Sequence, residues 1–131
     1  MTVENDLMII AIPDDYQQLV TTLDCYATLR GHDVRVFQGP AQSLDELSAQ
    51  LKDAEVIVAL GTHRVFDEEL LQWAPKLRWI QALTTGTDAV TGLKSLKPEV
   101  VITTNTGIHG PQMSEMTLMH MLNLTRQAAT M

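Results

Sequence analysis

The sequence predicts an α/β fold in which helices cover both faces of a five-stranded parallel sheet, in a flavodoxin-like order, with a protruding C-terminal helix. Three observations support this prediction. Five short apolar runs alternate along the 131 residues with stretches of helical periodicity. The connections between these segments are short, as expected for helical crossovers between parallel strands. Polar loops follow the later apolar runs, which is typical of the ligand-binding edge of such a sheet.

The five predicted strands are short runs of mostly branched apolar residues. Most are apolar at consecutive positions, which is typical of strands covered by helices on both sides. The second run instead alternates apolar and polar residues, as an outer strand does. In chain order the runs occupy residues 7–12, 34–37, 56–60, 79–83 and 100–104.

The first helix is predicted between Asp14, which can cap its first turn, and Gly31, which suits a left-handed residue at its end. Apolar residues recur at helical spacing between these two positions. Cys25 falls within this amphipathic pattern and is the only cysteine. We therefore predict that Cys25 is a buried thiol of a cytoplasmic protein.

The next two helices carry clear start signals. Residues 43–46 read Ser-Leu-Asp-Glu, a capping-box pattern, and precede an apolar stripe that includes Leu47 and Leu51. Residues 67–69 place three acidic side chains at the start of the third helix, where they suit the helix dipole. Pro75 ends this third helix.

The last helix is predicted to begin at Pro111, a residue favoured in a first helical turn. Its apolar residues lie on nearly all sides of the helix, which predicts burial on more than one side. Residues 125–131 lack the Gly or Pro that usually ends a helix. We therefore expect either that the chain continues or that this helix packs on another copy. The apolar residues are Met113, Met116, Leu118, Met119, Met121, Leu122, Leu124, Ala128, Ala129 and Met131.

Composition excludes several classes of function. A net charge of −7 and an isoelectric point near 4.8 argue against nucleic acid, whose phosphates need a basic surface. No apolar run approaches the length of a membrane span, and the acidic N-terminus does not resemble a signal peptide. The predicted location is therefore cytoplasmic, without membrane or nucleic-acid partners.

A rim of polar loops is predicted where the third, fourth and fifth strands end. It comprises residues 61–64, 84–88 and 105–112. Gly86 gives its loop access to positive φ and lets a ligand approach the main chain. Consecutive N–H groups in such a turn can hold an anion. The rim therefore suits a small carboxylate or carbonyl compound.

Three charged or titratable side chains belong to this rim. Arg64 could pair with a carboxylate, and His63 lies beside it. Both residues can equally be read as solvated loop residues. His109 stands next to the start of the last helix, a position that suits a role in binding.

Other uses of this fold fail at the strand ends. A phospho-receiver would need an acidic residue after the third strand and a Lys after the fifth, and neither is present. A flavin phosphate loop after the first strand would meet Asp14 and Asp15, which repel phosphate. The sequence has no Gly-x-Gly-x-x-Gly fingerprint and no Cys/His spacing of a metal site.

Two segments resemble the D-isomer-specific 2-hydroxyacid dehydrogenases: residues 77–88 (LRWIQALTTGTD) and 101–115 (VITTNTGIHGPQMSE). The resemblance is to the first part of the substrate-binding domain of that family. It implies that the turn containing Thr85, Gly86 and Thr87 holds a substrate carboxylate through main-chain N–H groups. Thr87 stands where the family often has an apolar residue, and Met116 stands where it often has His.

The resemblance also implies a division of the chain. Residues 1–110 would form the substrate-binding domain, and residues 111–131 would begin an interdomain helix leading to a missing NAD- or NADP-binding domain. The family's Gly-rich loop and its catalytic Arg, acid and His match no residue here, so no catalytic residue is assigned. We expect a small 2-oxo or 2-hydroxy carboxylate as ligand, a homodimer, no cofactor bound by these residues alone and no hydride transfer.

An alternative from a different class of protein remains open at this point. The chain could be a stand-alone, non-catalytic α/β interaction module that dimerises through its Met-rich C-terminal helix. Exposed methionines form adaptable binding surfaces, which favours this interpretation.

Overall fold

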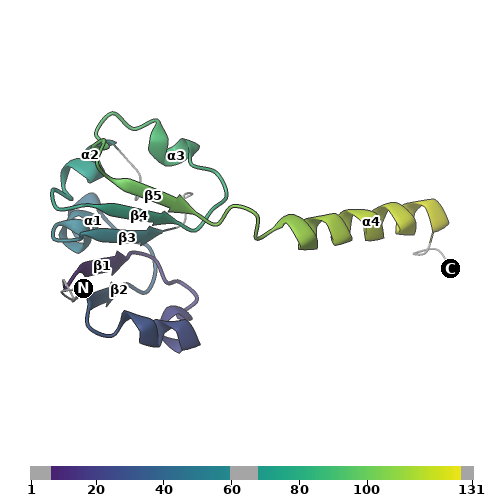
Figure 1. The fold of residues 1–131 in the computed structure, drawn as a ribbon, viewed down its shortest axis with the longest axis horizontal. Coiled ribbons are helices and arrows are strands. Elements are labelled where there is room, and N and C mark those ends of the chain that lie inside the picture. Colours follow the sequence, from purple (N-terminus) through teal and green to yellow (C-terminus); the bar gives the residue numbers. More distant parts are fainter. Residues whose placement is uncertain (1–6, 60–67, 128–131) are drawn as a thin grey trace, which may run out of the picture.

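The computed structural model describes residues 7–59 and 68–127. Within these ranges five parallel strands form one sheet in the order β2-β1-β3-β4-β5. The carboxyl ends of the strands therefore meet at one edge, from which the last helix leaves the domain (Figure 1). This is the flavodoxin-like order that the sequence predicts. The strands are β1 (Ile9–Ile12), β2 (Asp33–Val36), β3 (Val56–Ala59), β4 (Trp79–Ala82) and β5 (Val101–Thr104).

Three α-helices, α1 (Leu44–Leu51), α2 (Glu68–Gln72) and α3 (Asp88–Thr91), pack on one face of the sheet. Ile57 of β3 and Ile80 of β4 face each other in the sheet and are both fully buried beneath these helices. Apolar side chains from all three helices complete this main core. The helical members of the cluster are Leu47, Leu51, Leu71 and Val90.

The start of α1 follows the predicted capping box with one difference. Ser43 Oγ accepts a hydrogen bond from the N–H of Glu46 at 3.1 Å, as expected. The Glu46 carboxylate accepts from the N–H of Gln42 at 2.7 Å, one residue before the expected partner. Both bonds satisfy N–H groups around the first turn, so the helix begins where the sequence predicts.

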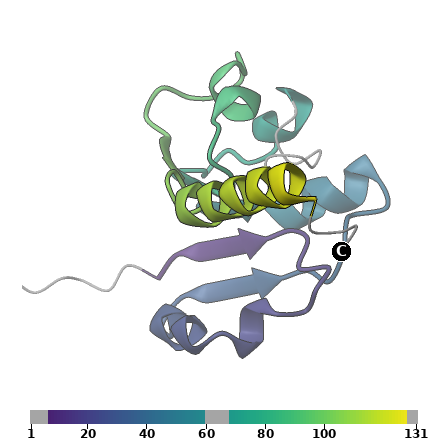
Figure 2. The ribbon, with the colours of Figure 1, turned by 90° about the vertical axis from the view of Figure 1, so that its right-hand side faces the viewer.

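The opposite face is covered over β1, β2 and β3. There the 3-10 helices η1 (Val20–Thr22) and η2 (Asp24–Leu29) pack against the strands. Figure 2 shows this helical segment beside β2, at the outer edge of the sheet. The buried strand residues of this smaller core are Ile10, Ile12 and Val56.

The prediction of one α-helix from residue 14 to residue 30 is wrong. The hydroxyls of Thr22 and Thr28 donate to carbonyls three residues earlier, at 2.7 and 2.6 Å. Such bonds compete with regular helix formation. Few apolar side chains of this segment are covered, so packing does not compensate, and Leu19 and Leu23 are about half exposed.

Two details of this segment also differ from expectation. Asp15, rather than Asp14, accepts hydrogen bonds from two N–H groups at the start of the turn, those of Leu19 and Val20. Cys25 is exposed rather than buried, because η2 has no buried residue. The prediction for Gly31 is confirmed, with φ of 103° at the end of the segment.

The last helix, α4 (Gly110–Arg126), extends away from the sheet (Figure 1). Pro111 lies in its first turn, as predicted. Every residue of α4 is exposed, including its methionines and leucines. The helix ends at Gln127, which adopts the left-handed conformation with φ of 52° although it is not glycine. An apolar helix without a covering surface within the described chain is thus the outstanding feature of the fold.

Acidification is expected to lower the melting temperature partly through Glu68 at the start of α2. Its carboxylate accepts hydrogen bonds from the N–H groups of Lys94, at 2.8 Å, and Ser95, at 2.9 Å. These bonds hold the pKa of Glu68 below its usual value. The stabilisation is therefore complete above the unfolded-state pKa and is lost as the pH falls through the folded-state pKa.

The measurement is the melting temperature of the protein from about pH 6 to about pH 3, the range in which carboxyl groups titrate. Glu68→Gln should show a shallower fall than the unmodified chain. Glu99→Gln, at an exposed position, is the matched control and should retain the original slope. Equal slopes for all three proteins would contradict this role of Glu68.

Candidate functional site

The turn after β4 lies at the carboxyl edge of the sheet and ends in the first turn of α3. The N–H of Leu83 donates to the carbonyl of Ala59 at 2.9 Å, so the last contact between β3 and β4 fixes where the turn begins. At the other end, the carbonyl of Thr87 accepts from the N–H groups of Val90 and Thr91, at 2.8 and 2.9 Å. Both ends of the turn are thus anchored.

The N–H groups between these anchors are available to a ligand. Within the described parts of the chain, those of Thr85, Gly86 and Thr87 donate to no protein acceptor. Thr85 and Gly86 are also exposed. Successive free N–H groups of this kind form a concavity that binds anions. The turn therefore has the donors that a carboxylate requires.

The loop after β5 is bonded to this turn. The N–H of Asn105 donates to the carbonyl of Thr84 at 3.0 Å, and the Thr106 hydroxyl donates to the carbonyl of Thr85 at 3.3 Å. The Thr84 hydroxyl donates to the carbonyl of Gly86 at 2.9 Å. These contacts occupy carbonyl oxygens of the turn, whereas the N–H groups of Thr85, Gly86 and Thr87 bond to none of the described residues. They therefore favour an anion over a cation as the ligand.

Gly86 serves the turn differently from the sequence-based expectation. Its φ is not positive, whereas Gly107 in the neighbouring loop has φ of 94°. A Cβ atom placed on Gly86 would meet no described atom within 4 Å. The local chain thus tolerates a side chain at this position, and the missing side chain leaves open space in front of the free N–H groups.

The other predicted site residues are only partly placed. His63 and Arg64 lie outside the described residues. His109 is the residue immediately before α4 and is exposed, and its side chain does not cap the helix. The bonds between the two loops involve Thr106 rather than His109.

A chain of polar side chains supports the site from the open face of the sheet, and the sequence analysis missed it. Trp79 Nε1 donates to the hydroxyl of Thr103 at 2.8 Å, and this hydroxyl donates to Gln81 Oε1 at 2.6 Å. Gln81 Nε2 then donates to Asn105 Oδ1 at 3.1 Å. Polar residues at alternate positions of the paired strands were the signal available in the sequence.

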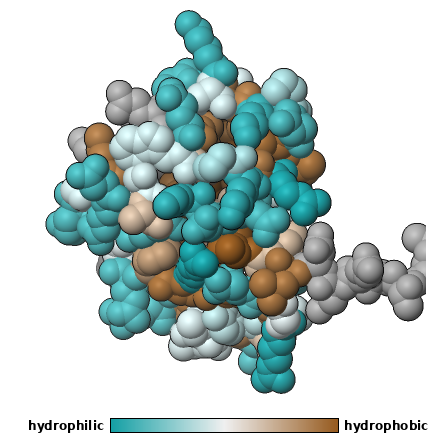
Figure 3. All heavy atoms as spheres, turned by 90° about the vertical axis from the view of Figure 1, so that its left-hand side faces the viewer, coloured by the Kyte–Doolittle hydropathy of each residue, from teal (hydrophilic) through white to brown (hydrophobic). Residues whose placement is uncertain are grey.

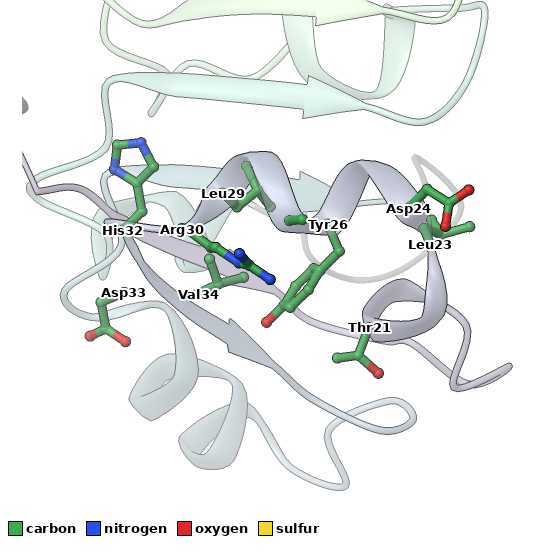
Figure 4. Close-up of a pocket in the computed structure, with 10 residues that line it drawn as sticks. Thr21, Leu23, Asp24, Tyr26, Leu29, Arg30, His32, Asp33 and Val34 are labelled. Atoms are coloured by element: carbon green, nitrogen blue, oxygen red, sulfur yellow. The ribbon is translucent and has the colours of Figure 1, made fainter.

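A larger and more open cavity lies elsewhere and has a different character. It measures about 680 Å³ and lies between η2 and β2. In Figure 4 Tyr26 and Arg30 extend from η2 toward each other, whereas the ring of His32 points away. Asp33 at its border is paired with Arg35 at 2.8 Å. This cavity is open and lies away from β4 and its turn, so we assign it no ligand.

The other features of the described residues do not point to a second binding site. The face at the amino ends of the strands carries mainly hydrophilic side chains with small apolar areas between them (Figure 3). In the described ranges, no group of three or more His, Cys, Asp or Glu side chains could hold a metal ion. No helix of the described chain has both the length and the apolar character needed to cross a membrane.

The sequence lacks the Gly-x-Gly-x-x-Gly fingerprint of a nicotinamide dinucleotide site. Such a cofactor needs a Gly-rich turn between a strand and a helix, where the helix N-terminus meets the pyrophosphate. The turn before α4 has only Gly107 and Gly110, without the spacing of the fingerprint. No residue is therefore assigned to cofactor binding.

Comparison with known proteins agrees with this geometry. The profile of a family described as "D-isomer specific 2-hydroxyacid dehydrogenase, catalytic domain" matches residues 9–129. None of the curated proteins compared with the chain matches it.

Three solved structures are similar to the chain. A D-isomer specific 2-hydroxyacid dehydrogenase family protein from Aeromonas salmonicida subsp. salmonicida A449 is 25% identical over 92% of this chain and 36% of its own, with a TM-score of 0.70. A phosphoglycerate oxidoreductase from Vibrio cholerae O395 is 29% identical over 77% and 32%, with a TM-score of 0.65. A structure from Ralstonia solanacearum, described as a D-3-phosphoglycerate dehydrogenase oxidoreductase, is 36% identical over 59% and 22%, with a TM-score of 0.53. The chain thus spans about a third or less of the length of these proteins.

Proposed function

Because this chain belongs to the D-isomer specific 2-hydroxyacid dehydrogenase family, matching its catalytic domain, we propose that it is the substrate-binding portion of an NAD(P)-dependent 2-hydroxyacid dehydrogenase. Its ligand is a small 2-oxo or 2-hydroxy carboxylate. The carboxylate binds to the N–H groups of Thr85, Gly86 and Thr87. His63, Arg64 and His109 remain proposed neighbours of the ligand. We also propose a cytoplasmic location, which the lone exposed thiol of Cys25 favours.

The observation that carries this proposal is the set of N–H groups at the carboxyl edge of the sheet that bond to no described residue. The edge is where ligands of open α/β sheets bind. The bonds from Asn105 and Thr106 hold the turn from behind, so its N–H groups need not reorganise to meet an anion. A pre-organised turn of this kind selects for the negative charge of a carboxylate.

Hydride transfer is proposed to need a coenzyme-binding part that these 131 residues do not supply. Residues 1–110 form the substrate-binding part in this proposal, and residues 111–131 begin the connection to the other part. The coenzyme, NAD or NADP, would supply or accept the hydride there. NADH oxidation by this chain at a normal turnover rate, with glyoxylate, pyruvate or hydroxypyruvate, would contradict the proposed inactivity.

Titration of the labelled protein with pyruvate tests the binding site directly. The amide NMR signals of Thr85, Gly86 and Thr87 should shift with one common dissociation constant, because one carboxylate meets all three N–H groups. The methyl ester of pyruvate, which lacks the negative charge, is the matched ligand and should cause little shift. Shifts of equal size with the ester, or shifts confined to other parts of the protein, would contradict the assignment.

A second candidate role, association through α4, is favoured by the exposure of its apolar side chains. We propose that a homodimer forms there, with Leu118 and Leu122 among the residues covered; both are about 60% exposed in the single chain. Sedimentation over a range of concentrations should show a growing dimer fraction. Replacing both leucines with Gln should reduce this fraction, and a monomer at every concentration would contradict the proposal.

A further inference from the structure

A small cavity beside the proposed carboxylate site bears on which 2-oxo acid this protein accepts. The cavity measures about 260 Å³ and opens at the carboxyl ends of β1, β3 and β4. The strand order 2-1-3 places it where the chain direction across the sheet reverses, which is the preferred ligand position in open α/β sheets. Ile12, Ala59 and Leu83 mark the three strand ends on its wall.

The cavity is continuous in sequence with the turn that would hold the carboxylate. Leu83 lines it, and Thr84 follows directly at the start of the turn. The bond from the N–H of Leu83 to the carbonyl of Ala59, at 2.9 Å, fixes this junction. A carboxylate on the free N–H groups therefore leaves the remainder of the molecule next to Leu83 and the cavity.

The lining of the cavity is mainly apolar. Side chains from the segment after β1 close it on the outer side, with Tyr16, Leu19 and Leu23 among them. Ligand pockets occupy about 300–1,000 Å³, so this one lies near the lower end of the range and has room for an aliphatic side chain. Burial of such a group in an apolar cavity raises affinity roughly fourfold for each CH₂ unit.

Two acidic residues also border the cavity and argue against a phosphorylated ligand. Asp15 is 8% exposed, and its carboxylate is held by the N–H groups of Leu19 and Val20 at 3.0 and 3.1 Å. Asp14 precedes it on the same wall. A phosphate group in this cavity would lie close to both acidic residues, and the chain as a whole carries a net charge of −7.

We propose that the ligand of this site is a 2-oxo or 2-hydroxy acid with a short, uncharged aliphatic side chain, which lies in this cavity. Phosphorylated hydroxyacids are excluded by the acidic border. This inference rests on the proposed carboxylate site and adds the class of side chain. The proposed ligand therefore differs from the phosphoglycerate to which the names of two structural relatives refer.

Titration of the 131-residue chain with a homologous series tests the inference. Pyruvate, 2-oxobutanoate and 2-oxopentanoate should bind with dissociation constants that fall roughly fourfold at each step. The phosphate ester of hydroxypyruvate should bind more weakly than pyruvate. Equal affinities along the series, or tightest binding of the phosphate ester, would overturn the inference and leave the carboxylate site intact. Failure of pyruvate itself to shift the turn amides would overturn the proposed function.

A variant tests whether the cavity is the source of the increase in affinity with the length of the ligand's side chain. Leu23→Asn removes an apolar wall at a position that is 51% exposed, so the fold should survive the change. The stepwise gain in affinity along the series should shrink or disappear in this protein, with the largest loss of affinity for 2-oxopentanoate. Leu124→Asn on α4, at a site that is 80% exposed, is the matched control and should keep the full gain. If the affinity of Leu23→Asn still rises along the series of 2-oxo acids, then the side chain of the ligand binds elsewhere.

Discussion

Replacing Gly86 with Asp is expected to reduce the affinity for pyruvate by about fivefold to several hundredfold. The new carboxylate would lie a few ångströms from the bound one, and like charges at 4 Å repel by about 1 kcal/mol in water and about 4 kcal/mol near a protein surface. The fold should tolerate the change, because a Cβ at Gly86 meets no described atom within 4 Å. The amide titration with pyruvate gives the affinity.

Two further variants separate charge from other effects. Gly86→Ala adds a methyl group without charge and should cost much less affinity than Gly86→Asp. Asn123→Asp adds the same negative charge on the exposed surface of α4 and should leave binding unchanged. If Gly86→Asp binds pyruvate as tightly as the unmodified chain, then the turn is not the carboxylate site.

Ile57→Ala should lower the free energy of unfolding by about 2–5 kcal/mol, the cost of removing a fully buried aliphatic side chain. Ile57 lies on β3, the central strand, and is fully buried. Domains of this size are stable by only about 5–15 kcal/mol, so this one change would remove a large share of the stability. Urea unfolding followed by circular dichroism measures the loss.

The control removes a comparable side chain from an exposed position. Val101 on β5 is 58% exposed, so Val101→Ala should change the free energy of unfolding by about 0.5 kcal/mol or less. The midpoint of urea unfolding should therefore be clearly lower for Ile57→Ala than for Val101→Ala. Similar midpoints would mean that the face of the sheet beneath α1, α2 and α3 is not the main core.

The sheet could be predicted from the sequence because its evidence is local. A run such as residues 56–59 is apolar at every position, and only a strand covered on both sides suits such a run in a chain of this size. The first helix followed equally regular spacing and was nevertheless predicted wrongly. Its formation depended on packing and on competition from the hydroxyls of Thr22 and Thr28, which spacing does not reveal.

The candidate site was predictable in position and not in detail. A polar, Gly-containing loop after an apolar run indicated where a ligand would bind, and Gly86 lies at that edge. The bond between Thr106 and Thr85 joins residues 21 positions apart. Which carbonyl oxygens of the turn are occupied depends on this tertiary contact, so the hydrogen bonding of the turn could not be predicted from either segment alone.

The exposed helix α4 has a consequence for how the protein unfolds. Its 17 residues lack the tertiary packing that supplies most of the stability of helices in proteins. Its backbone amides should therefore open by local fraying and exchange hydrogen quickly, while those of β3 exchange only through global unfolding. The part of this chain that unfolds cooperatively should therefore end near Gly107. The helix α4 would join that unit only when another surface packs against it.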